Sequence, residues 1–210
     1  MKKNNKILFD WGGTIIRDDL LFKDIAENSG NENATFDGPD CWDNIRVIGN
    51  ENYFDNIQDK FLLCGVTYDK AIDVVSKYTS NEKLNSFSYV VFDNKPFLDK
   101  IKSLDYSISQ AVRLNNGVVN GIYAEGDKVR LCKEVGINIA VDDDPRIALS
   151  LASAGIKTIL VSRIWNRRFD LDNINLYIPY RKKAAIKDNL QIAEDWHDVD
   201  IRVNNIIRSI

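Results

Sequence analysis

The sequence predicts an α/β protein with a doubly wound parallel sheet and a small helical insertion after the first strand. Short apolar runs end in acidic residues at Asp10 and at Asp142-Asp143, and helical patterns alternate with such runs in the second half of the chain. This alternation is typical of parallel sheets. With 210 residues and 44% hydrophobic content, the chain can bury one main core but not two large ones. We therefore assign residues 1–17 and 90–210 to the α/β core and residues 18–89 to an inserted helical cap.

The first strand and the insertion follow from residue spacing. The run KILFD at residues 6–10 is apolar and ends in an acid, and the Gly-Gly-Thr sequence at residues 12–14 indicates a tight loop after it. Within residues 18–89, apolar residues recur at spacings of three and four, for instance in the segment 71–78. Such spacing predicts amphipathic helices.

The later elements alternate regularly. Pro145 suits the first turn of a helix capped by Asp144, and Gly155 suits the end of that helix. The other predicted elements are, in order, a helix after Pro96, a strand Tyr106–Val112, a helix at about Asp127–Val135, a strand Ile137–Val141, a strand Ile156–Val161 and a final amphipathic helix from Trp196 to Ile210.

Composition and charge exclude several classes of protein. No run of eighteen apolar residues exists, and Asp10 interrupts the apolar run near the amino terminus, so we expect a cytoplasmic protein without membrane contact. The three cysteines form no CxxC pair, and there is one histidine, so neither a disulfide framework nor a zinc site is indicated. A net charge of −3 argues against a nucleic-acid polymer as partner.

The charge is distributed unevenly along the chain. Residues 18–89 contain 14 acidic and 6 basic residues, whereas the remainder contains 17 acidic and 22 basic residues. A solvated helical surface accounts for the acidic part, and the positive remainder suits a small anionic substrate.

Two predicted strands end in acid, at Asp10 and at Asp142-Asp143. The carboxyl ends of parallel strands open on the same edge of a sheet, so we expect these carboxylates to converge there. Mg²⁺ prefers hard oxygen ligands, typically one or two carboxylates together with water and phosphate oxygens. The sequence therefore predicts a Mg²⁺ site at this edge.

At these residues the sequence resembles the haloacid dehalogenase (HAD) superfamily. Ile7–Thr14 (ILFDWGGT) is similar to the first motif of these hydrolases, and Val141–Arg146 (VDDDPR) is similar to the fourth. Lys128 stands where the third-motif lysine would be. A weaker resemblance, in Ile164–Arg167 and in Trp196 before the last helix, points to the 5′-deoxyribonucleotidase branch.

The resemblance implies a fold, a mechanism and a set of site residues. The fold would be a HAD-like Rossmannoid core with a cap, acting on a small phosphorylated molecule. Asp10 would be the nucleophile that forms an aspartyl-phosphate, and Lys128 would hold it and the phosphoryl oxygens. The metal would bind Asp10, the carbonyl oxygen of Gly12 and either Asp142 or Asp143. The other candidates are predicted to bind the substrate, and they are Gly13, Thr14, Ser109, Arg113 and Asn166.

Two positions depart from the family pattern. Gly12 stands where phosphatases of the superfamily carry the aspartate that protonates the leaving oxygen. The second-motif Ser or Thr is also missing, since the strand predicted to carry it ends in Gln110-Ala111-Val112; Ser109 and Arg113 are the nearest substitutes. A general acid is worth about 10²–10⁴ in rate, so hydrolysis of alkyl phosphates should be slow.

Three functional hypotheses remain open at this point. The first is a Mg²⁺-dependent phosphohydrolase, with a nucleotide as the best-supported substrate. The second is a protein that binds Mg²⁺ and a phosphorylated ligand without turning it over. The third is a phosphonatase, because those members of the superfamily have a small residue at the position of Gly12, although no cap lysine can be singled out for their Schiff base.

Overall fold

The computed structural model describes residues 4–28, 67–92, 121–124, 127–170 and 186–210. In this part of the chain, a seven-stranded sheet has the order β2-β3-β1-β5-β6-β7, and β4 also pairs with β3. All pairings are parallel except that of β2 with β3. The strands are β1 Asn5–Asp10, β2 Ser80–Asn81, β3 Ser86–Phe92, β4 Gly121–Tyr123, β5 Ile139–Asp142, β6 Lys157–Val161 and β7 Leu190–Ala193.

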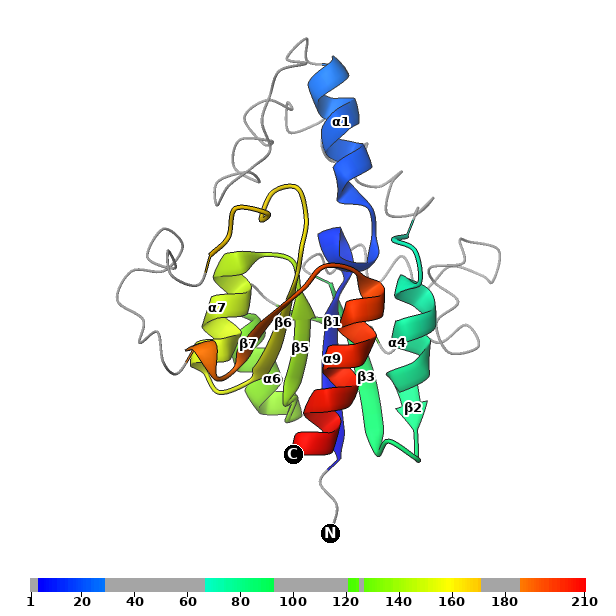
Figure 1. Ribbon diagram of the computed structural model, residues 1–210, viewed down its shortest axis with the longest axis vertical. Helices are drawn as coiled ribbons and strands as arrows, with labels where there is room; N and C mark the ends of the chain where they lie inside the picture. Colours follow the sequence, from blue (N-terminus) through cyan, green and yellow to red (C-terminus); the bar gives the residue numbers. More distant parts are fainter. Residues whose placement is uncertain (1–3, 29–66, 93–120, 125–126, 171–185) are drawn as a thin grey trace.

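Helices cover both faces of the sheet (Figure 1). They are α1 Asp18–Asn28, α4 Ala71–Thr79, α6 Lys128–Val135, α7 Pro145–Ser153 and α9 Trp196–Ser209. On one face, α4 and α9 pack on side chains such as Ile7 and Phe9 of β1. On the other, α6 and α7 pack on Leu8 of the same strand. Because β1 is buried from both sides, its apolar run is continuous, and the doubly wound parallel sheet predicted from the sequence is confirmed.

The β5–α7 unit agrees closely with its sequence. Asp144 caps α7 by accepting a hydrogen bond from the backbone N–H of Arg146 at 2.7 Å, and Pro145 is the first helical residue. Gly155 follows the helix with a φ of +85°, which a residue with a side chain adopts only under strain. The predicted cap, start and end of this helix are confirmed.

The boundary of the insertion differs from the sequence-based expectation. Residues 18–89 were assigned to the cap, yet α4 packs on the sheet, and β3 pairs in parallel with β1 from Ser86 onward. The helical spacing of 71–78 was interpreted correctly as amphipathic, but its apolar side faces the main core. Spacing alone does not specify the surface on which a helix packs.

The strand beside β1 also differs from expectation. We expected Tyr106–Val112 to be the next core strand, but β3 occupies the position next to β1. The segment Tyr106–Val112, with Ser109 and Arg113, lies outside the described residues. At the carboxyl terminus, Ile210 was expected on the buried side of the last helix, whereas it follows α9 and is 53% exposed.

Backbone contacts join the segment before α1 to the segment before α4. Ile16, just before α1, forms an antiparallel bridge with Thr67, just before α4. The backbone N–H of Tyr68 donates to the carbonyl oxygen of Ile15 at 3.0 Å. In Figure 1, α1 extends away from the carboxyl edge of the sheet directly beyond this bridge.

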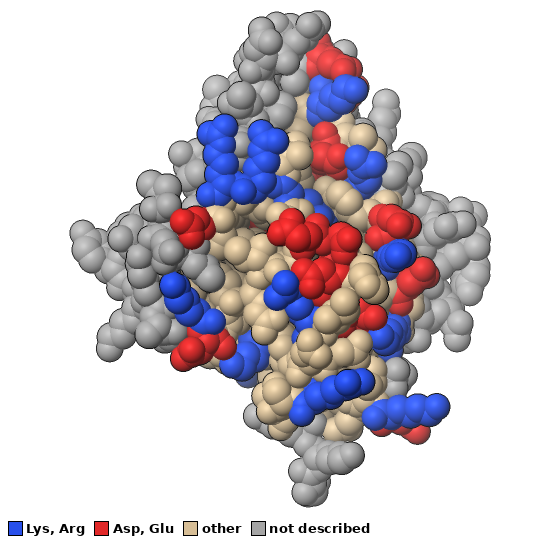
Figure 2. All heavy atoms as spheres, in the orientation of Figure 1, with Lys and Arg blue, Asp and Glu red and all other residues tan. Residues whose placement is uncertain are grey.

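Charges of both signs occur on the face of the molecule that Figure 2 shows. On the face in Figure 2, the Lys and Arg side chains of the described residues are interspersed with Asp and Glu and form no continuous basic surface. None of the helices in the described ranges is long and apolar enough to cross a membrane.

Candidate active site

Asp10 ends the central strand and begins the loop that shapes the site. The loop is a single turn, Trp11–Ile15, and Gly13 in it has a φ of +65°. A Cβ atom on Gly13 would clash with the carboxylate of Asp143, so only glycine allows the loop to approach that acid so closely. We call this segment the Asp10 loop.

Strand register brings the predicted acids together. Phe9 pairs with Val141 across β1 and β5, so Asp10 and Asp142 end adjacent strands side by side. Asp10, Asp142 and Asp143 are all buried, and one carboxylate oxygen of each lies within 4.8 Å of the others. The convergence expected from the two acidic strand ends is therefore present.

Lys128 bridges two of these acids. Its Nζ atom lies 2.7 Å from Oδ1 of Asp10 and 3.0 Å from Oδ2 of Asp142, and only 4% of its side chain is exposed. Lys128 is the first residue of α6, and Asp127 caps that helix by accepting from the backbone N–H of Arg130. The start of α6 thus places the ammonium group of Lys128 beside Asp10, at the carboxyl end of β1.

Asp143 is held by groups from two other segments. Its Oδ1 accepts a 2.6 Å hydrogen bond from the hydroxyl of Thr14, and its Oδ2 accepts a 2.8 Å hydrogen bond from the indole N–H of Trp165. Burial raises the pKa of Asp143 to about 7, and the negative charge of Asp142 is the second largest cause of the shift. Burial also raises the pKa of Asp142, and the ammonium of Lys128 opposes that shift.

The charge balance fits a metal ion. Among the described residues, these three buried carboxylates lie near two buried cations, Lys128 beside Asp10 and Asp142 and Arg163 acting on Asp143, so the cluster is still negative when its acids are ionised. Buried charges are unfavourable unless they are paired, and a divalent cation with oxygen ligands would provide the pairing. Asp10, Asp142 and Asp143 can therefore hold a metal ion between β1 and β5.

Two predicted substrate ligands have other partners in the structure. The hydroxyl of Thr14 donates to Asp143, with a longer 3.5 Å contact to Asp10. Asn166 is buried, and its amide donates to the carbonyl oxygens of Asp143 and Val161. Its side-chain oxygen accepts from the backbone N–H of Arg163. Both side chains therefore fix the geometry around Asp143.

Sequence reasoning missed two buried charged residues. Arg163, just after β6, donates from Nε to the carbonyl oxygen of Gly13 at 2.7 Å and from Nη2 to that of Thr14 at 2.9 Å. Asp18, the first residue of α1, is 5% exposed and accepts a hydrogen bond from the backbone of Gly13. The position of Arg163 just after a predicted strand could have identified it as a candidate site residue. Asp18 was overlooked because acidic residues are common at the start of a helix, whatever their function.

The carboxyl group of Asp18 lies beside the glycine that replaces the expected acid. A Cβ atom on Gly12 would be 3.3 Å from Oδ2 of Asp18. Burial raises the pKa of Asp18 well above its usual range, and the nearby charge of Asp143 adds to this shift. The structure therefore places an acid next to the position where the family pattern has one.

Comparison with known proteins gives the fold. Eighteen chains of solved structures match this chain. A hydrolase from Pseudomonas syringae is 11% identical, with 96% of this chain and 99% of that chain covered and a TM-score of 0.52. A HAD hydrolase, family IA, variant 3, from Entamoeba histolytica is 13% identical, with 98% and 100% covered and a TM-score of 0.50. No protein-family model and no curated protein sequence matches the chain. The chain thus has the α/β fold of HAD-type hydrolases.

Proposed function

We propose that this protein is a Mg²⁺-dependent phosphohydrolase of the HAD type, acting on a small phosphorylated molecule through an aspartyl-phosphate at Asp10. The observation that carries the proposal is the cluster at the carboxyl edge of the sheet. A buried aspartate ends the central strand, a buried lysine contacts it at 2.7 Å, and two further acids complete an ion-binding arrangement. These are the groups that phosphoryl transfer to a carboxylate needs.

Each residue of the cluster has its own role in the proposed reaction. Lys128 holds Oδ1 of Asp10, so we expect Oδ2 to attack phosphorus. The new O–P bond forms as the bond to the leaving oxygen breaks, and water then cleaves the aspartyl-phosphate, which restores Asp10 and releases phosphate. A bound Mg²⁺ would screen the repulsion between the carboxylates and the phosphate. Asp142 and Asp143 would hold that ion, while Thr14 and Trp165 keep Asp143 in place.

The proposal assigns the missing proton donor to Asp18. Its carboxyl group borders the position of Gly12, and its burial favours the protonated form. A protonated carboxyl group at this place can protonate the leaving oxygen, and the resulting carboxylate can activate water in the second step.

Asp18→Asn should slow the hydrolysis of alkyl phosphates more than that of para-nitrophenyl phosphate. An alkoxide needs a proton to leave and nitrophenolate does not, so the loss for 2-phenylethyl phosphate should approach the roughly 10²–10⁴-fold that a general acid is worth. Steady-state rates on both substrates measure the difference. Glu27→Gln makes the same kind of change on an exposed part of α1 and should leave both rates unaltered. Equal losses on the two substrates would remove Asp18 from this role.

Mg²⁺ should raise the thermal unfolding midpoint, and more at pH 8 than at pH 5.5. The pKa of Asp143 in the folded protein, about 7, lies above that of a free aspartate. Between about pH 4 and 7 the folded protein therefore keeps a proton that the unfolded chain has released, and without metal this group lowers stability as pH rises through that range. Mg²⁺ competes with the proton and should stabilise most above pH 7.

The measurement is a thermal melt with Mg²⁺ or with a chelator at each pH and at constant ionic strength. Sodium chloride at the same ionic strength is the control for general salt effects. An equal gain at both pH values would show that Asp143 does not exchange its proton for the ion.

Turnover of para-nitrophenyl phosphate and of a panel of small organic phosphates, with and without Mg²⁺, tests the proposed function. The nucleotide preference expected from the segment Ile164–Arg167 stays a prediction. Two of its side chains, Trp165 and Asn166, are hydrogen-bonded to Asp143 within the protein and so do not by themselves indicate a nucleotide. Nucleoside monophosphates therefore belong in the panel beside sugar phosphates and phosphorylated acids.

Gly12 favours one alternative, a protein that binds Mg²⁺ and a phosphorylated ligand without hydrolysing it. A folded protein that binds Mg²⁺ but hydrolyses nothing in the panel would support this alternative and overturn the hydrolase.

A further inference from the structure

The Asp10 loop has little rigidity of its own. Gly12 has a φ of −70° and a ψ of 136°, and Gly13 has a φ of 65° and a ψ of −27°, close to the two central residues of a type II turn. Two consecutive glycines restrict the backbone less than any other pair of residues, so they do not by themselves hold this conformation. Contacts from outside the loop must therefore fix it.

Arg163 supplies two of these contacts, which we call the Arg163 clamp. Its Nε donates to the carbonyl oxygen of Gly13 at 2.7 Å, and its Nη2 donates to that of Thr14 at 2.9 Å. Both nitrogens belong to one planar guanidinium, so a single rigid group holds two successive carbonyls. Because the N–H of a trans peptide points opposite to its C=O, the amide hydrogens of Thr14 and Ile15 are directed away from Arg163.

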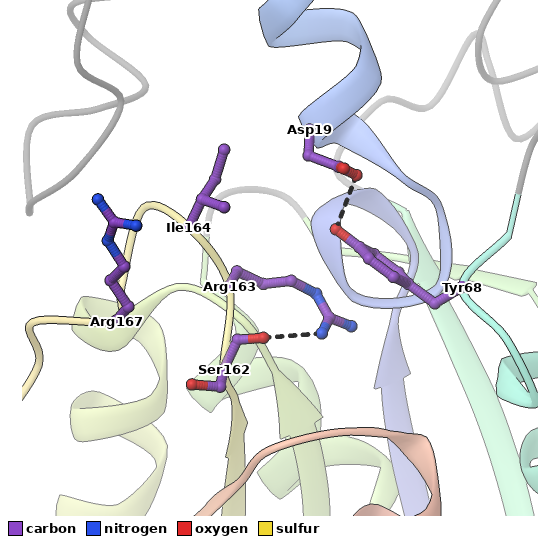
Figure 3. A pocket seen from close by; sticks show the side chains of 6 residues that line it. All are labelled: Asp19, Tyr68, Ser162, Arg163, Ile164 and Arg167. Atoms are coloured by element: carbon purple, nitrogen blue, oxygen red, sulfur yellow. Dashed lines mark hydrogen bonds between the residues drawn. The ribbon is translucent and has the colours of Figure 1, made fainter.

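Arg163 is itself held from several sides. Its Nη1 donates to the carbonyl oxygen of Ser162 at 2.8 Å (Figure 3), and its backbone N–H donates to the side-chain oxygen of Asn166 at 2.7 Å. The guanidinium carbon lies 3.6 Å from the centroid of the Tyr68 ring, and the residue is 9% exposed. The backbone N–H of Tyr68 in turn donates to the carbonyl oxygen of Ile15. A guanidinium fixed in this way can fix the loop that it binds.

The two carbonyls in the clamp belong to residues that contact Asp143. The hydroxyl of Thr14 donates to Oδ1 of Asp143 at 2.6 Å, and the carboxylate of Asp143 fills the place where a Cβ atom on Gly13 would lie. A rotation of either peptide would therefore change how the loop and Asp143 contact each other. Asp143 is one of the three acids proposed to hold the metal ion, so the shape of the ion site depends on the clamp.

We propose that Arg163 is a positioning residue that holds the Asp10 loop against Asp143 and thereby maintains the Mg²⁺ affinity of the site. The inference rests on the metal site of the proposed function and adds a residue that acts on this site through Gly13 and Thr14. The role belongs to the paired N–H donors of the guanidinium rather than to its positive charge.

The clamp and the charge have opposite effects on Mg²⁺ binding. The positive charge of Arg163 acts on Asp143 and repels a second cation, so removing the charge alone should tighten Mg²⁺ binding. Loss of the clamp should weaken binding, by the roughly 10- to 100-fold that is typical when a group that orients a metal ligand is lost. The sign of the change therefore distinguishes the two roles.

Calorimetric titration of Arg163→Lys and Arg163→Ala with Mg²⁺ measures this change. Lysine keeps the positive charge but lacks the planar pair of donors, so both variants should lose affinity. Arg202→Ala is the control, because Arg202 pairs with Asp198 within α9 at 2.9 Å, and its loss should leave Mg²⁺ binding at the wild-type value. Circular dichroism identifies the folded variants, and Arg163→Lys carries the test if Arg163→Ala does not fold.

Added guanidinium distinguishes the clamp from a general loss of structure. The space vacated in Arg163→Ala adjoins a cavity of about 290 Å³ that Arg163 and Tyr68 help to line, so a guanidinium ion can enter it. At concentrations far below those that unfold proteins, guanidinium chloride should restore part of the Mg²⁺ affinity in Arg163→Ala. It should restore none in Arg163→Lys, where the lysine side chain fills the space. Sodium chloride at the same concentration should have no effect on either variant.

Turnover separates this inference from the proposed function. In a working hydrolase, the Mg²⁺ concentration for half-maximal turnover of para-nitrophenyl phosphate should rise in both Arg163 variants by the same factor as the dissociation constant, while KM changes less. Weaker Mg²⁺ binding in these variants, without turnover in the wild-type protein, would keep the inference and reject the hydrolase. Wild-type affinity in folded Arg163→Lys, or tighter binding in Arg163→Ala, would overturn the inference and leave the hydrolase in place.

Discussion

Replacement of Asp10 by asparagine should abolish turnover of para-nitrophenyl phosphate. An amide oxygen is a poor nucleophile, so the aspartyl-phosphate cannot form, and we expect a loss on the order of 10⁴-fold or more, as when other hydrolases lose their nucleophile. Asparagine has nearly the volume of aspartate and should fit the same space at the end of β1. Residual rates in the variant also measure contamination by other phosphatases.

Asp10→Asn should also distinguish a loss of catalysis from a loss of folding. Asp10 is one of three clustered buried acids and shares the ammonium of Lys128 with Asp142, so removing its charge reduces repulsion in the cluster. The variant should therefore be at least as stable as the wild-type protein in urea unfolding without metal. Wild-type turnover in Asp10→Asn would remove Asp10 from the mechanism. Loss of turnover in an unfolded variant would say nothing about it, so circular dichroism accompanies the assay.

Lys128→Met should produce the largest loss of stability. It would leave Asp10 and Asp142 buried without their ammonium partner, and breaking a buried pair from one side costs about 3–5 kcal/mol. Urea unfolding at pH 8 without metal measures the change. The loss should shrink at low pH, because the acids then gain protons and no longer need a cation.

Lys77→Met is the control for Lys128→Met. Lys77 pairs with Asp200, but both side chains are partly exposed, at 39% and 26%, so its loss should cost no more than about 1 kcal/mol. The double variant Lys128→Met with Asp142→Asn should recover part of the stability, because it removes one of the two orphaned charges. Equal losses in the two single lysine variants would mean that Lys128 does not stabilise the cluster.

The cluster was predictable because it follows from strand ends. A parallel sheet brings the carboxyl ends of its strands to one edge, so Asp10, Asp142 and Asp143 had to converge once the alternation of elements was recognised. Lys128 was placed by resemblance, and the structure brings it to the same edge as the first residue of α6. Local signals at Asp144, Pro145 and Gly155 were sufficient for α7, since each acts through its nearest neighbours.

The remaining features depend on contacts between distant segments. The period of residues 71–78 is that of any amphipathic helix, and only packing against α9 and the sheet identifies α4 as part of the core. Asn166 has the right chemistry for a substrate ligand, but its amide is used by backbone carbonyls. Arg163 reaches the Asp10 loop across 150 positions of sequence, a pairing that no local pattern encodes.

The bridge between Ile16 and Thr67 has a consequence for how such a protein can evolve or be engineered. The bridge holds the residue before α1 beside the residue before α4, so the two ends of the connection between them are fixed next to each other. Closing a longer or shorter connection changes the free energy only slowly with its length, by about 0.6 kcal/mol per doubling. We therefore expect that residues between the end of α1 and Thr67 can be exchanged while β1, Asp18 and α4 keep their places. Sequence variation after α1 should therefore leave both Asp10 and Asp18 in position.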